Sequence, residues 1–246
     1  MSSIQYGNKT ILFNVERSNR RKTVGIYIDP ERGVIVRSPR FLKIDNINEI
    51  VRKRARWIIE KQEFLKNHSH LLGSVKEFVS GEAFPYLGKQ YRLKVVKSST
   101  EKEEKCKLVN GRFLVEVNSD LKGESVKRNV KKALIQWYVA HAEEKIAERI
   151  KLYSRQIGKW PERVEIKNHK RRWGSCSPGE VIRFNWKIVM APMTIVDYVI
   201  VHELCHLIYH HHFSQFWQKV QTIIPDYKKR RNTLKEYSFQ LATFDE

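Results

Sequence analysis

A pair of histidines in the stretch VIVHELCHLI, residues 199–208, constrains the fold of this chain more than any other feature. His202 and His206 are four residues apart, and Glu203 directly follows the first, in the pattern H-E-x-x-H. Side chains four residues apart lie on one face of an α-helix. Because the flanking residues are almost all apolar, we expect a buried helix that presents both imidazoles on the same side.

Two imidazoles placed in this way are typical of a zinc site. Both can bind one ion, and Glu203 can hydrogen-bond a water molecule at the metal without occupying it. Catalytic zinc sites use three protein ligands and leave a fourth position open. The sequence therefore predicts one Zn²⁺ ion, although manganese, cobalt or nickel would suit similar ligands. The alternative is a helix whose histidines are simply packed or hydrogen-bonded, and the apolar setting and the histidines downstream weigh against it.

The third ligand is expected among the histidines that follow, which are His210, His211 and His212. On a straight helix His210 would lie about 12 Å along the axis from the first histidine, too far to share an ion. His212 is six residues beyond the second histidine, the spacing of sites in which the chain turns back to the metal. Tyr209 stands where that pattern has glycine, so the turn needs another conformation. The order of preference is His212, then His211, then His210.

The three cysteines, Cys106, Cys176 and Cys205, are odd in number and widely spaced, so no disulfide framework is expected. Cys205 points off the face that the two histidines share, and a small apolar core residue is the simpler interpretation. No apolar run reaches the ~18 residues of a membrane span, and the first residues lack the apolar stretch of a signal peptide. We expect a cytoplasmic protein without a membrane partner.

The chain is strongly basic. It has 47 Lys and Arg against 27 Asp and Glu, a formal net charge of +20. Basic clusters recur along the whole length, as RSNRRK at 17–22, RKRAR at 52–56, HKRRW at 169–173 and KKRR at 228–231. This charge favours a polyanionic partner, either a nucleic acid or a nucleotide, while a merely soluble basic surface is the alternative.

Strand and helix patterns alternate along the chain. The first 40 residues and the stretch from 86 to 118 are rich in β-branched and aromatic residues, and Asn110-Gly111 is a strong hairpin signal. Helical periodicity marks about 45–67 and about 124–156.

Together these patterns predict an α+β protein with a boundary in the loop near residue 120. We expect a β-rich N-terminal region over residues 1–120, with one long helix at about 45–67, and a second domain over residues 121–246.

Several further motifs precede the histidine pair in a fixed order. They are RWGSC at 172–176, NW at 185–186, AP at 191–192 and DYV at 197–199. In this order they resemble the YgjP-like metallopeptidase family, a relative of the SprT-like zinc proteases. The resemblance covers about residues 125–240 and is weaker over the N-terminal β-rich part. It implies that residues 121–246 form a zincin-like metallopeptidase domain, in which the H-E-x-x-H helix packs on a small sheet.

The resemblance also implies a ligand set. The family has its third histidine in an N-H-S-x-x-F-W stretch, and HHFSQFW at 211–217 aligns His212 with it. His211 replaces the usual asparagine and Phe213 the usual small residue. His202, His206 and His212 are then the metal ligands, and Glu203 is the catalytic general base.

The RRWGS stretch before the helix is a candidate substrate-binding segment. A strand that ends in Gly174 and Ser175 could let another backbone approach and offer its edge to an extended substrate. Arg171 or Arg172 could stabilise oxyanion or phosphate charge. Trp173 belongs to the same segment, although simple packing within a sheet explains it as well.

Three functions follow from these features. The first is a zinc-dependent hydrolase that cleaves amide bonds in a protein or peptide. The second is a nucleoside-triphosphate (UTP) pyrophosphatase that uses the same site, as members of the family are also described, but the chain has no phosphate-binding glycine-rich loop and no acidic magnesium cluster. The third is a nucleic-acid-binding protein with structural zinc, which three histidines and a glutamate disfavour because structural sites are closed and often cysteine-rich. The sequence defines neither the substrate nor the oligomeric state.

Overall fold

The computed structural model describes residues 2–29, 32–67, 76–99, 105–169 and 172–237. The chain divides into two compact units, Met1–Leu72 and Gly73–Glu246, each with its own hydrophobic core. The described residues form three small sheets and six α-helices, so the expected α+β class is confirmed. None of these helices is both long enough and apolar enough to cross a membrane.

The first unit is a four-stranded sheet with two helices on one face. Its elements are β1 (Ser2–Tyr6), β2 (Lys9–Ser18), β3 (Gly25–Asp29), β4 (Gly33–Pro39), α1 (Ile44–Lys53) and α2 (Ala55–Asn67). The strand order is β1-β2-β4-β3, with β2 and β4 parallel and the other pairs antiparallel. Alternate strand residues such as Phe13 and Val36 pack against Val51 and Ile58 of the helices.

The single helix expected at about 45–67 is in fact two helices. Arg54, with φ −106° and ψ 6°, interrupts them. Its amide still donates to the carbonyl groups of Ile50 and Val51, and its own carbonyl accepts from Ile58. Helical hydrogen bonding therefore continues across one distorted residue, which explains why the apolar periodicity looks continuous in the sequence.

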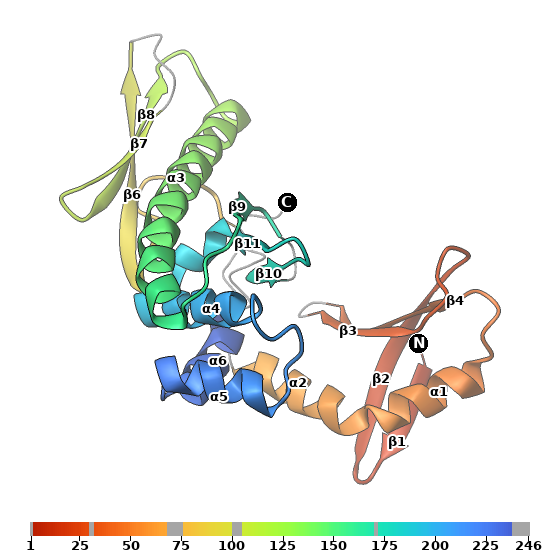
Figure 1. The fold of residues 1–246 in the computed structure, drawn as a ribbon. Coiled ribbons are helices and arrows are strands. Elements are labelled where there is room, and N and C mark those ends of the chain that lie inside the picture. The colour runs from red at the N-terminus through yellow and green to blue at the C-terminus, as the bar shows by residue number, and fades with distance from the viewer. Residues whose placement is uncertain (1, 30–31, 68–75, 100–104, 170–171, 238–246) are drawn as a thin grey trace. The chain divides into compact units, whose positions relative to one another are not determined.

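The second unit is built around one long helix, α3 (Glu124–Ile157). The remaining elements of this unit are β5 (Ala83–Tyr86), β6 (Lys89–Ser98), β7 (Cys106–Val109), β8 (Arg112–Asn118), β9 (Arg163–Lys167), β10 (Gly174–Cys176), β11 (Val181–Asn185), the 3₁₀ helix η2 (Trp186–Met190), α4 (Met193–Cys205), α5 (Ser214–Ile223) and α6 (Tyr227–Tyr237). Figure 1 shows the β5–β8 sheet beside the N-terminal part of α3 and the β9–β11 sheet nearer its C-terminal part.

The β5–β8 sheet belongs to this second unit, so the structure divides the chain earlier than the expected boundary near residue 120. The turn between β5 and β6 explains this. The amides of Leu87 and Gly88 donate to the carbonyl groups of Val189 and Met190, at 2.7 and 3.2 Å. Gly88 also lies so close to Pro192 that an added Cβ would be 2.8 Å from that ring. The turn therefore braces the start of α4, a long-range contact that composition does not reveal.

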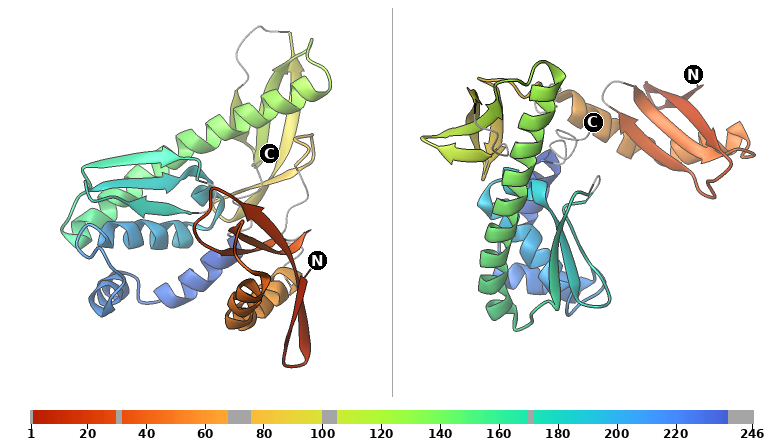
Figure 2. Two further views of the ribbon diagram at one scale, coloured as in Figure 1. Left: turned by 90° about the vertical axis from the view of Figure 1, so that its right-hand side faces the viewer. Right: turned by 90° about the horizontal axis from the view of Figure 1, so that it is seen from above.

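The β9–β11 sheet has the order β10-β11-β9, so β10 is an edge strand of the described sheet. Strand β11 is parallel to β9 and antiparallel to β10. In Figure 2, α4 runs along one face of this sheet, and it contacts both β10 and α3.

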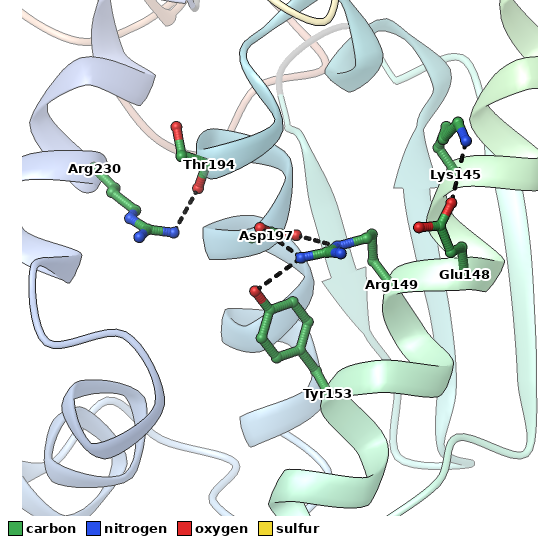
Figure 3. A network of polar contacts seen from close by, with 7 residues as sticks. All are labelled: Lys145, Glu148, Arg149, Tyr153, Thr194, Asp197 and Arg230. Carbon is green, nitrogen blue, oxygen red and sulfur yellow. Dashed lines mark hydrogen bonds and ion pairs between the residues drawn. The ribbon is translucent and has the colours of Figure 1, made fainter.

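A partly buried ion pair joins α3 to α4 (Figure 3). The guanidinium of Arg149 donates to both carboxylate oxygens of Asp197, at 2.6 and 3.0 Å, and to the hydroxyl of Tyr153 at 3.3 Å. From the other side, Arg230 of α6 donates to the carbonyl of Thr194 at 3.1 Å. These contacts fix α4, the helix with the H-E-x-x-H motif, between α3 and α6.

Candidate metal centre

Three imidazoles meet where α4 ends. His202 lies in its last turn, His206 is the residue that caps it, and His212 lies in the loop before α5. One ring nitrogen from each lies within 4.8 Å of those of the other two, and Nε2 of His212 is 3.1 Å from Nε2 of His202. Within the described part of the chain this is the one such group, and His210 and His211 are not part of it.

The chain turns back to bring His212 to the site without a left-handed residue. Between His206 and His212 no residue has a positive φ, including Tyr209, where related patterns place glycine. Two bonds to the carbonyl of Cys205, from the amides of Ile208 and Tyr209 at 3.1 and 2.9 Å, tighten the end of the helix. A tightened last turn therefore takes the place of the glycine.

The three side chains fit a metal ion. Nδ1 of His206 is 2.9 Å from the carbonyl oxygen of Tyr209, so the ring donates there and leaves the lone pair of Nε2 for an ion. Burial and the nearby His206 and His212 rings lower the pKa of His202 to about 3, so its imidazole is neutral, as a ligand must be. In a tetrahedral zinc site with bonds of about 2.0–2.1 Å, ligand nitrogens lie roughly 3.3 Å apart, close to the separation between His202 and His212.

An aromatic wall supports the three imidazoles. The fully buried ring of Phe216 contacts all of them, with centroid distances of 5.0 Å to His202, 4.6 Å to His206 and 4.7 Å to His212. Trp217 stacks on His212 at 5.5 Å and on Tyr227 of α6 at 5.3 Å. His212 is the most exposed of the three, and its ring is therefore supported by the stacked rings of Trp217 and Tyr227.

Phe216 and Trp217 were not singled out as site residues from the sequence. The signal was present, because both aromatic residues fall at the start of a helix just after the third histidine. Their contacts to His202 and His206 span ten or more residues, however, and depend on how the chain turns.

The side chain of Glu203, a residue of α4, lies against the edge strand β10. Its side chain is 7% exposed, and burial raises its pKa to about 8, while the positive charge of Arg172 acts in the opposite direction. A Cβ added to Gly174 would be 2.7 Å from Cγ and Oε1 of Glu203. The close backbone approach expected at Gly174 is therefore an approach to the glutamate of the motif.

Three other candidate substrate-binding residues, Arg172, Trp173 and Ser175, lie within two residues of Gly174 in the chain, and they differ in exposure. Arg172 is exposed, and Ser175 is half-buried in β10. Trp173 is 8% exposed and packs in the core, and its carbonyl accepts a bond from the amide of Asn185 at 2.7 Å. Arg171 lies outside the described residues.

Asn185 holds this segment in place. Its side-chain amide donates to the carbonyl groups of His169 and Arg172, at 2.6 and 3.3 Å, and its side-chain oxygen accepts from the amide of Lys187 at 3.1 Å.

Cys205 is fully buried within the core and is no member of the histidine group, as its position off the shared face indicated.

Comparison with protein families finds a match over most of the chain. The YgjP-like metallopeptidase domain model covers residues 22–237, which is most of the chain. Comparison with curated proteins and with solved structures finds no match.

Proposed function

Since this chain belongs to the YgjP-like metallopeptidase family, and is a metal-dependent hydrolase at the level of that family, we propose that it cleaves amide bonds in proteins or peptides. The observation that carries this proposal is the meeting of His202, His206 and His212 beside a buried glutamate. The contact of α4 with the β9–β11 sheet is compatible with a zincin-like domain.

The three histidines would hold the ion, and zinc is the metal that neutral imidazoles in this number suit best. A divalent cation bound there acts as a Lewis acid that lowers the pKa of water and polarises a carbonyl group. The aromatic wall formed by Phe216 and Trp217 orients the imidazoles and limits the access of solvent from that side.

Glu203 is the proposed general base. It follows the first ligand directly in the helix, so its side chain leaves the helix one position further round than His202. Its carboxylate accepts a proton from the attacking water and donates it to the leaving amide nitrogen. The half-buried edge strand β10, with Ser175 in it, offers backbone groups to an extended substrate, and the exposed Arg172 stands next to that edge.

Variants at the site test the proposal. Glu203→Gln should keep the metal content of the parent and lose at least about 100-fold in kcat, because the amide cannot take the proton. His202→Ala should lose both metal and activity, since it removes a ligand. The measurements are metal analysis and the release of peptides from denatured casein by zinc-loaded protein.

The same samples should be incubated with UTP. Peptide release without UMP supports the proposal. UMP release without peptides would assign the site to nucleotides instead, and full activity of Glu203→Gln on casein would remove the glutamate from the role of base.

A further inference from the structure

Gly174 lies against the side chain of Glu203 more closely than any other residue type could. A Cβ on Gly174 would be 2.7 Å from Cγ, 2.7 Å from Oε1 and 2.9 Å from Cδ of that glutamate. Favourable contacts between non-bonded carbon atoms begin at about 3.5 Å, so even a methyl group would overlap three atoms of Glu203.

The backbone conformation at Gly174 does not itself require glycine. The residue lies in an extended strand, pairs with Phe184 of β11 and has no positive φ. Any residue can adopt this conformation, and glycine in a strand carries an entropic penalty. The reason for glycine at this position is therefore the space that Glu203 occupies.

We propose that Gly174 is a positioning residue for Glu203. Because Gly174 has no side chain, β10 can pack directly against the carboxylate of Glu203 on α4. This packing restricts the carboxylate to one orientation. This inference rests on the proposed role of Glu203 as the base, and it replaces a direct substrate-binding role for Gly174. A base must be held close to its productive geometry, and a misplacement of about 1 Å can lower the rate about 100-fold.

The steric part of the inference can be tested without any substrate. Gly174→Ala should lower the thermal midpoint of the parent by about 2–10 °C, as overpacking does in a protein of this size. In a Glu203→Ala background the overlapping atoms are gone, so the same substitution should lower the midpoint by less than half as much. An equal loss in both backgrounds would overturn the inference. If Gly174→Ala does not fold in the parent, Glu203→Ala should restore folding, and failure to do so would overturn it as well.

Gly179→Ala is the matched control. Gly179 lies in the turn between β10 and β11, has no positive φ, and has open space where its Cβ would lie. This variant should melt within about 1 °C of the parent. A destabilisation equal to that of Gly174→Ala would show that the effect belongs to the hairpin rather than to the contact with Glu203.

The positioning part is read from kinetics. Gly174→Ala should bind the parent's amount of zinc, lose about 100-fold in kcat on a peptide substrate and change KM less than about twofold. Added to Glu203→Gln it should have no further effect on kcat, because the base is already absent. A rise in KM at unchanged kcat would assign Gly174 to substrate binding and reject the inference. Failure of the proposed function would instead appear as an active Glu203→Gln protein, whatever the melting data show.

Discussion

At the scale of single residues, the position of the His212 ring depends on neighbouring aromatic side chains. His212 lies in a loop and is more exposed than the other two, and the stacked ring of Trp217 limits its motion. Trp217→Ala should therefore weaken zinc binding about 10–100-fold, the usual effect of removing a group that orients a ligand. Trp217→Phe, which keeps an aromatic face, should retain most of the affinity.

Competition with a chelator of known affinity measures this effect. Trp160→Ala is the control, because Trp160 is an exposed tryptophan that lies beside Ile146 and Ile150 of α3 rather than in the group of three imidazoles. Unchanged zinc affinity in Trp217→Ala would show that the loop holds His212 without the stack.

The sequence predicts those features of the site that depend on residues close together in the chain. Spacing places His202, His206 and Glu203 on one helix, and family resemblance singles out His212. Spacing and family resemblance do not predict two contacts in the site. One is the contact of Glu203 with Gly174, and the other is that of Phe216 with all three imidazoles. These contacts depend on how β10 and α5 pack, which short-range patterns do not encode.

At the scale of helices and strands, the ion pair between α3 and α4 is a principal link. Arg149 and Asp197 are both largely buried, and Asp197 holds the pKa of the guanidinium above its usual value. Asp197→Ala should lower the free energy of unfolding by about 3 kcal/mol, because it leaves a largely buried charge unpaired. Chemical denaturation measures the change.

A neighbouring ion pair on the same helix provides the control. Lys145 and Glu148, drawn in Figure 3, are more exposed, so Glu148→Ala should change stability by less than about 0.5 kcal/mol. If the two substitutions destabilise equally, burial of the Asp197 pair does not matter. Replacing Arg149 and Asp197 together by apolar residues should be milder than Asp197→Ala alone.

Element patterns in the sequence identified most helices and strands, and the structure groups the strands differently from the expected division near residue 120. The hairpin at Asn110-Gly111 is present, with both residues at positive φ. The region up to residue 120 looks like one β-rich part because strand patterns dominate both of its ends, yet the β5–β8 sheet packs with α3. The assignment of strands to one unit or the other depends on long-range contacts such as that of Gly88 with Pro192. Short sequence patterns do not predict such contacts.

At the scale of the whole molecule, metal binding should act on one unit only. All three imidazoles lie in Gly73–Glu246, and the core of Met1–Leu72 shares no residue with the core of that unit. Zinc at about 100 times its Kd should stabilise the second unit by about 2.7 kcal/mol, which raises its melting temperature by about 5–11 °C.

Hydrogen exchange with and without a chelator measures where this stabilisation falls. Removal of zinc should speed exchange in peptides from α4 and α5 and leave those from β2 and β4 unchanged. His212→Ala should abolish the difference. Equal loss of protection in the sheet of the first unit would show that the two units unfold together.

The turn beyond α4 has a consequence for biosynthesis. A ribosome that has translated the H-E-x-x-H motif has made two of the three imidazoles, and His212 follows six residues after His206. The rings that stack beside His212, first Trp217 and then Tyr227, are synthesised later still. If the proposed ligand set is right, a nascent chain interrupted within this interval lacks the third imidazole, and fragments that end there should bind zinc weakly and show no hydrolysis.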